Sequence, residues 1–213
     1  MLVSSIERPR YVVAHAVRSA VGRGQDRVAV VQRDYVVVLA VADGSGGMRG
    51  GAEAAERAIR LVTDQARRDA TGDEEAWAAF IARLDAAPGD QSGQCALVIA
   101  AIIEGMIMGA SAGDCGAWLI HEGLDDLTDQ QVRKPLVGSG SAMPVPFRKS
   151  IGSGTLLLAS DGLFKYVRQK DITNLSLRED LDAAAQELTE LPRLRSGEIP
   201  DDVAVILCRA EVE

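Results

Sequence analysis

Aspartates recur at the ends of the apolar segments of this sequence. They lie beside segments typical of strands, at Asp26, Asp43, Asp114, Asp161, Asp201 and Asp202. If two sheets bring these ends together, the carboxylates converge, and like charges that close do not all stay ionised without a cation. Mg²⁺ and Mn²⁺ prefer oxygen ligands, and pairs of such ions about 4 Å apart activate water for attack on phosphorus. The pattern therefore indicates a divalent-cation site, although a single Asp-Gly pair is also a common turn.

The elements that must position these aspartates are strands and helices in an irregular order. Apolar runs rich in Val and Ile predict strands over residues 11–17, 27–32, 35–42, 95–103, 106–112, 115–121, 155–159 and 203–208. Apolar residues at helical spacing predict helices over 52–68, from a capping box at 71–74 to a stop at Pro88-Gly89, and from Leu181 to a stop at Pro192. Short connections at Arg33-Asp34, Glu104-Gly105 and Gly113-Asp114 favour antiparallel neighbours.

This order lacks the regular alternation of strand and helix that builds a parallel sheet. We therefore expect an α+β fold in which helices cover antiparallel sheets. Residues 122–154 are rich in Gly, Ser and Pro, so we expect them to be mostly loop. No internal repeat or low-complexity linker divides the 213 residues, which predicts one domain over 1–213.

Composition excludes several classes of function. The chain has 23 Lys and Arg against 31 Asp and Glu, a net charge of −8, whereas a surface that follows nucleic-acid phosphates has the opposite sign. The start shows no secretory signal, and the long apolar stretch 95–113 is interrupted by Glu104-Gly105, so we expect a cytoplasmic protein without a membrane partner. Three scattered cysteines and two histidines argue against a disulfide scaffold and a Cys/His zinc site.

Five short segments surround the aspartates in chain order. They are Gly-Gln25-Asp26-Arg, Val-Ala-Asp43-Gly-Ser-Gly-Gly, Ala-Gly-Asp114-Cys-Gly, Ala-Ser-Asp161-Gly-Leu and Asp201-Asp202-Val-Ala-Val. In this order they resemble the Asn-Glu-Asp, Asp-Gly-x-Gly-Gly, Gly-Asp-Ser-Arg, Ser-Asp-Gly and Asp-Asn-x-Thr-Val elements of the metal-dependent Ser/Thr protein phosphatases of the type 2C (PPM) family. The similar segments span Gln25 to Leu207, which is nearly the whole chain.

The resemblance implies a fold and a set of metal ligands. The implied fold is a pair of antiparallel sheets packed face to face with helices outside, a four-layer αββα sandwich. The implied ligands are Asp43 bridging two metals with the Gly44 carbonyl, Asp161 and Asp201 completing one shell each, Asp26 acting through waters, and Asp114 holding a third metal. We place Asp201 rather than Asp202 in the shell because Asp202 aligns with the family's Asn, and a slip of one residue leaves Asp202 as the alternative.

The resemblance also implies an activity. It is the hydrolysis of phosphoserine and phosphothreonine in proteins by a metal-bridging water, with Asp43, Asp161 and Asp201 as the catalytic residues. Two or three Mn²⁺ or Mg²⁺ ions are the implied cofactors. The implied partners are a phosphorylated protein substrate and a cognate Ser/Thr kinase.

Departures from the family pattern concern the binding of substrate. Where the family has an upstream phosphate-binding Arg, this chain has Val21, and Arg23 or Arg18 are the candidate substitutes because a guanidinium suits phosphate. Cys115 and Gly116 replace the family's Ser and Arg, and Ala204 replaces its closing Thr. The alternative is therefore a catalytically impaired, phosphatase-like regulatory or phosphoprotein-binding module.

Two other patterns match known enzymes less well. The glycines from Gly44 to Gly51 follow a strand and precede a helix, but Arg49 stands where a nucleotide-binding loop needs glycine. Residues 109–113 satisfy the Gly-x-Ser-x-Gly pattern of serine hydrolases around Ser111. The triad partners would have to be Asp114 and His121, which are too close along the chain to fold back around that serine.

Overall fold

The strands form two antiparallel sheets of five strands each. The computed structural model describes residues 10–33, 35–45, 50–70, 73–87 and 93–211. The first sheet has the order β1 (Tyr11–Arg18), β10 (Val203–Ala210), β9 (Thr155–Ala159), β6 (Gly116–Ile120) and β7 (Leu124–Asp126). The second sheet has the order β2 (Arg27–Arg33), β3 (Val36–Ser45), β4 (Gln94–Ile103), β5 (Met106–Ala112) and β8 (Val145–Ser150).

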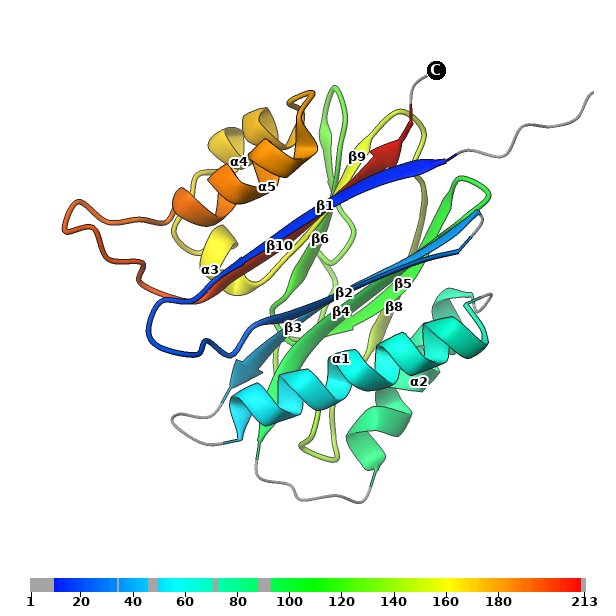
Figure 1. Cartoon of the computed structure of the whole chain (residues 1–213). Coiled ribbons are helices and arrows are strands. Elements are labelled where there is room, and N and C mark those ends of the chain that lie inside the picture. The colour runs from blue at the N-terminus through cyan, green and yellow to red at the C-terminus, as the bar shows by residue number, and fades with distance from the viewer. Residues whose placement is uncertain (1–9, 34, 46–49, 71–72, 88–92, 212–213) are drawn as a thin grey trace, which may run out of the picture.

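Helices cover the outer face of each sheet (Figure 1). On the second sheet lie α1 (Gly51–Arg68) and α2 (Glu74–Ala86). The first sheet carries α3 (Asp161–Phe164), α4 (Gln169–Ser176) and α5 (Leu181–Glu190). Because the two sheets pack face to face between these helical layers, the expected four-layer αββα sandwich is confirmed.

The central strand β3 is buried on both faces because successive side chains of a strand point to opposite sides. Leu39 and Val41 pack in the core between the sheets, whereas Ala40 and Ala42 face the core beneath α1 and α2. A third core layer, which includes Leu157 of β9, fills the space between the first sheet and its helices. Burial on both faces explains why these strands are continuous apolar runs in the sequence rather than alternating ones.

Two of the three short connections lie between strands that pair as predicted. β2 pairs with β3 from Arg27–Ala42 to Arg33–Val36, and β4 pairs with β5 across Glu104-Gly105. Asp34, part of the first predicted turn, lies outside the described residues. The antiparallel pairing expected across Gly113-Asp114 is wrong, because β5 belongs to the second sheet and β6 to the first. The chain crosses between the sheets at this point and places Asp114 between them.

Residues 122–154 hold more regular structure than expected. They contain β7 and β8, each of which is an edge strand, in the first and the second sheet respectively. β7 has three residues, and β8 carries Pro146, which is tolerated at an edge because that position need not donate to a neighbouring strand. Neither segment shows the alternation that predicts a strand.

The predicted helices are confirmed in α1, α2 and α5. Asp73 is the N-cap of α2, where its side chain accepts a hydrogen bond of 2.8 Å from the Ala76 N–H. Thr71 of the expected capping box and the predicted stop at Pro88-Gly89 lie outside the described residues. The two short helices α3 and α4 were not predicted, because four and eight residues give too little periodicity.

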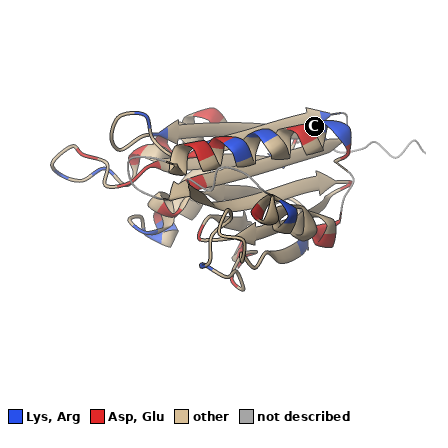
Figure 2. Cartoon of the chain, turned by 90° about the horizontal axis from the view of Figure 1, so that it is seen from below, with Lys and Arg blue, Asp and Glu red and all other residues tan. Residues whose placement is uncertain are grey.

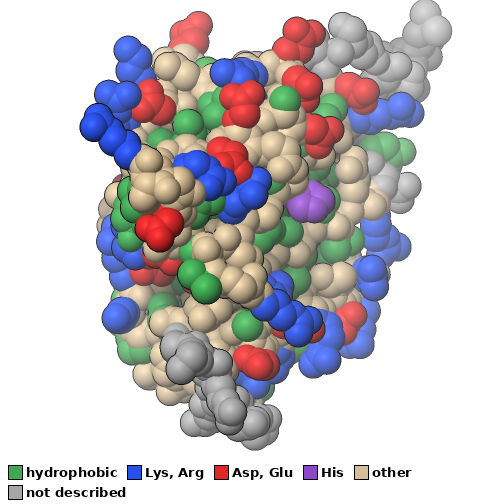
Figure 3. Space-filling view, turned by 60° about the vertical axis from the view of Figure 1, so that its left-hand side comes forward, with side chains coloured by type: hydrophobic (Ala, Val, Ile, Leu, Met, Phe, Trp, Pro, Cys, Tyr) green, Lys and Arg blue, Asp and Glu red, His purple; other side chains and the backbone are tan. Residues whose placement is uncertain are grey.

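Charged side chains lie mainly on helices and loops, while the strands carry few of them (Figure 2). On the face shown in Figure 3, basic and acidic side chains are intermixed rather than gathered into one basic patch. This face therefore lacks the electrostatic footprint of a nucleic-acid surface, in agreement with the net charge of −8. None of the helices in the described part of the chain has both the length and the apolar character needed to cross a bilayer.

Candidate metal centre

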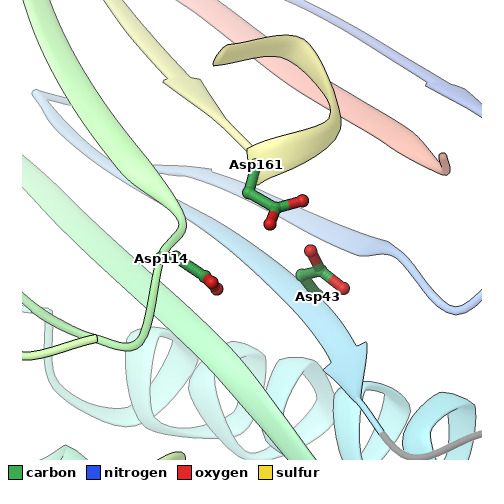
Figure 4. A group of neighbouring side chains, drawn as sticks. All are labelled: Asp43, Asp114 and Asp161. Atoms are coloured by element: carbon green, nitrogen blue, oxygen red, sulfur yellow. The ribbon is translucent and has the colours of Figure 1, made fainter. Parts of the chain in front are cut away.

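Three carboxylates converge at one end of the sandwich. Asp43 of β3, Asp114 of the crossing between β5 and β6, and Asp161 at the start of α3 each offer an oxygen, and these atoms lie within 4.8 Å of one another. Figure 4 shows the three side chains pointing toward a common space from different elements. Hard divalent cations take carboxylate oxygens gathered in this way.

Backbone packing fixes two of these positions. Asp43 lies inside β3 rather than after it, because the pairing with β4 continues through Asp43 opposite Ala96 to Ser45. The next residue, Gly44, packs so closely on the start of α1 that an added Cβ would lie 2.3 Å from the Gly51 carbonyl oxygen. At Gly162, after Asp161, an added Cβ would lie 2.0 Å from the Asp202 carbonyl oxygen. In each Asp-Gly pair the aspartate therefore supplies a carboxylate, and the glycine allows another backbone segment to pack closely beside it.

Asp26 is buried beside this cluster, with 2% of its surface exposed. Neither of its carboxylate oxygens makes a hydrogen bond of normal geometry within the described part of the chain. Burial raises the pKa of Asp26 to about 7. The side chains of Ser160 and Asp43 lower this pKa, whereas the negative charge of Asp202 raises it further. An unpartnered buried carboxyl group of this kind is costly, and a nearby cation or its waters would supply the missing partner.

Asp43 has the strongest electrostatic conflict of the converging residues. Burial raises its pKa to about 9, and the neighbouring charges of Asp26, Asp161, Asp114 and Asp201 contribute in the same direction. The pKa of Asp114 is also raised, chiefly by burial and then by Asp161. Carboxyl groups whose pKa values are raised by burial and by one another indicate a site arranged for added positive charge.

The two adjacent aspartates before β10, Asp201 and Asp202, make different contacts. Both carboxylate oxygens of Asp202 accept backbone hydrogen bonds, from Ala20 N–H at 2.7 Å and from Gln25 N–H at 2.5 Å. Asp202 thereby holds the loop between β1 and β2, which ends in Asp26. The Asp201 carboxylate instead contacts Lys165. Its Oδ1 accepts a hydrogen bond of 3.1 Å from the adjacent Asp202 N–H, so among the described residues Asp201 does not hold a distant backbone segment as Asp202 does.

Lys165 is a site residue that sequence reasoning missed. Its Nζ lies 3.0 Å from Oδ2 of Asp161 and 3.3 Å from Oδ2 of Asp201. The spacing of four residues from Asp161 was the available signal, since residues four apart on a helix are neighbours. A single lysine after a strand-end aspartate belongs to none of the motifs that drew attention to the site.

The cluster opens into a cleft of about 910 Å³. Arg23 and Val21 line this cleft, and the Val21 side chain is 86% exposed and apolar. Arg18 does not line it; its guanidinium pairs with Glu190 of α5, at a separate hollow. Of the two candidate phosphate-binding arginines, the structure brings only Arg23 to the cleft.

The other nucleophile-based patterns are not assembled. Ser111 is 1% exposed within β5, and both ring nitrogens of His121 have other partners: Nε2 lies 3.2 Å from Asp125 Oδ2, and Nδ1 accepts a hydrogen bond of 3.0 Å from the Gly123 N–H. All three cysteines are buried; burial raises the pKa of Cys95 and of Cys208 to about 12, and also raises that of Cys115. Neutral buried thiols are poor nucleophiles, so these three cysteines are unsuited to form a covalent intermediate.

Comparison with solved structures finds similar folds in bacterial phosphatases. A bacterial serine phosphatase superposes with a TM-score of 0.80 at 18% identity, covering 96% of this chain and 99% of that one. The serine/threonine phosphatase PstP/Ppp of Mycobacterium tuberculosis gives 0.75 at 20% identity, covering 95% and 99%. The phosphatase Stp1 of Staphylococcus aureus gives 0.75 at 17% identity, covering 96% and 95%.

A further similar structure is the catalytic domain of the phosphatase PstP in complex with two manganese ions, with a TM-score of 0.75 at 20% identity, covering 95% of this chain and 99% of that one. No protein-family model and no curated protein sequence matches the chain. The structural likeness extends over nearly the full length of each chain and shows that this chain has the fold expected from the resemblance.

Proposed function

We infer that the protein is a divalent-cation-dependent phosphatase that hydrolyses phosphoserine and phosphothreonine in proteins. The observation that carries this inference is the convergence of Asp43, Asp114 and Asp161 within 4.8 Å at the open end of the sandwich. The fold of bacterial serine/threonine phosphatases supports it. We further propose that residues 1–213 act as one domain.

The residues present fit Mn²⁺ or Mg²⁺. The donors are carboxylate oxygens, the unpartnered Asp26 lies beside them, and the pKa values of Asp43 and Asp114 are raised in the absence of added charge. We propose that Asp43, the Gly44 carbonyl, Asp161 and Asp201 hold two cations, that Asp26 supports them through waters, and that Asp114 helps to hold a third. Bound cations of this type lower the pKa of water toward neutrality and offset the negative charge of a phosphate group.

The protein's own residues give the site its shape and charge. Asp202 fixes the loop that carries Arg23 and Asp26 by accepting two of its backbone N–H groups. Arg23 lines the cleft, where its guanidinium can donate to the phosphate oxygens of a substrate. In this proposal the substrate approaches from the open side of the cleft, while the buried cysteines take no part.

The protein substrate implies a kinase of matching specificity, and we propose a cognate Ser/Thr kinase as the enzyme that supplies it. We also propose a cytoplasmic location. Three buried cysteines without a disulfide are consistent with a reducing compartment.

The alternative is a phosphatase-like module that binds phosphoproteins without turnover, and the exposed apolar Val21 favours it. The test compares phosphoserine, phosphothreonine and phosphotyrosine peptides in the presence of Mn²⁺, following both binding and phosphate release. Release from the first two peptides supports the phosphatase. Saturable binding of these peptides without phosphate release would support the module instead.

A further inference from the structure

Lys165 bridges two carboxylates of the candidate metal centre. It directly follows α3, and its ammonium group contacts the carboxylates of Asp161 and Asp201, which come from chain segments 40 residues apart. Among the described residues, no other ion pair joins a Lys or Arg side chain to Asp43, Asp161 or Asp201. Within the described part of the chain, Lys165 is therefore the basic side chain that pairs directly with these carboxylates.

The same two carboxylates are proposed ligands of the divalent cations. A cation and an ammonium group that compete for the same oxygens repel each other, so binding of one weakens binding of the other. The Lys165 side chain is 54% exposed and ends a flexible four-carbon stem. It can leave the carboxylates by changing rotamer, without movement of the backbone.

The displaced ammonium group stays at the cleft, because Lys165 is one of the residues that line it. Arg27, which also lines the cleft, is held by backbone carbonyl groups instead. The guanidinium of Arg27 donates to the carbonyl oxygens of Gly24 at 2.9 Å and of Asp26 at 2.8 Å. Val21, where the resemblance implies an arginine, has no charge to offer a phosphate group.

We propose that Lys165 has two positions: it neutralises Asp161 and Asp201 before divalent cations bind, and it binds the substrate phosphate once they have displaced it. This inference rests on the proposed function. It makes Lys165 both an internal competitor for the cations and, beside Arg23, a second phosphate-binding residue that helps to compensate for Val21. An ammonium group is a compact charge that binds phosphate without the fixed geometry of a guanidinium.

The test uses the full chain, Lys165→Met and the matched control Lys134→Met. Lys134 lines the same cleft and forms no ion pair with a described residue. Isothermal titration calorimetry of the metal-free protein with Mn²⁺ measures the affinity for the cation directly and does not depend on catalytic activity. Lys165→Met is expected to bind Mn²⁺ roughly threefold to tenfold more tightly than the unchanged protein, the range for losing two partly exposed ion pairs. Lys134→Met is expected to match the unchanged protein.

The second titration adds inorganic phosphate to each protein saturated with Mn²⁺. Lys165→Met is expected to bind phosphate about tenfold more weakly, and Lys165→Arg to retain most of the affinity. Equal or weaker Mn²⁺ binding by Lys165→Met would overturn the competition, and unchanged phosphate binding would overturn the second position. If the unchanged protein binds no Mn²⁺, the metal-dependent function itself fails, which is a separate result.

Discussion

The Asp202 carboxylate accepts a hydrogen bond of 2.5 Å from the backbone N–H of Gln25, 177 residues earlier in the chain. A second bond, from Ala20 N–H, uses its other oxygen. Together they tie the start of β10 to the loop that carries Arg23 and Asp26. The residue beside a proposed metal ligand thus has a positioning task of its own.

This relationship separates the effects of two adjacent substitutions. Asp202→Ala removes two charge-assisted hydrogen bonds, and we expect the free energy of unfolding to fall by roughly 2 kcal/mol. Asp201→Ala is expected to weaken Mn²⁺ binding with little loss of stability. Urea unfolding of the metal-free proteins and Mn²⁺ titration measure the two quantities. Equal stability losses in both variants would contradict this division.

The raised pKa of Asp43 makes the stability of the metal-free protein depend on pH. Because the folded pKa is about 9 and the ordinary value is 3.8, the folded state holds more protons than the unfolded state between these limits. Stability is therefore greatest below about pH 4 for this group and falls as pH rises toward 9, by at most roughly 1.4 kcal/mol per pH unit for one proton.

Asp43→Asn is expected to flatten this slope, because the neutral amide does not titrate. Urea unfolding in the presence of a chelator at pH 5, 7 and 9 measures it. The exposed Asp182 on α5 provides the control, and Asp182→Asn should leave the slope as it is. A decline for Asp43→Asn as steep as that of the unchanged protein would refute the assignment.

Arg23 and Arg18 are expected to differ in their effect on substrate binding. Arg23 lines the cleft, so Arg23→Ala is expected to raise KM for p-nitrophenyl phosphate roughly threefold to tenfold with a smaller change in kcat. Arg18 pairs with Glu190, and Arg18→Ala is expected to leave KM unchanged and to cost less than about 1 kcal/mol of stability. A larger rise in KM for Arg18→Ala would show that the wrong arginine had been placed at the substrate.

The cysteines are expected to be unreactive in the folded protein. Cys95, Cys115 and Cys208 are buried, and burial raises the pKa of each thiol. Iodoacetamide at neutral pH should label none of them in the native state and all three in urea, as counted by mass spectrometry. Rapid labelling of Cys115 in the native protein would place a reactive thiol beside Asp114 and reopen a covalent mechanism.

Much of the fold could be predicted from the sequence, because long apolar runs and helical spacing identify most strands and the three longer helices. The pairing across Gly113-Asp114 could not, since the same short connection serves a hairpin and a crossing between sheets. β7 and the helix α3 are too short for a period to appear. Pro146 and three exposed polar residues hide β8.

The converging aspartates could also be predicted, because each lies at or near a strand end within a recognisable segment. The roles of Lys165 and Asp202 could not, because they depend on contacts between distant parts of the chain. Asp85 of α2 is a similar case: its buried carboxylate accepts bonds from the backbone N–H groups of Gly138, Gly140 and Ala142. Local sequence does not indicate that a helical aspartate holds a remote loop.

The most direct test of the central claim is phosphate release from a phosphothreonine peptide as a function of Mn²⁺ concentration. The unchanged protein is compared with Asp43→Asn and Asp161→Asn, with Asp182→Asn as the control. The account predicts turnover that requires Mn²⁺, is retained in the control and falls by at least roughly a hundredfold in both site variants. Turnover that persists in a chelator, or that survives Asp43→Asn undiminished, would contradict a metal-dependent phosphatase centred on these carboxylates.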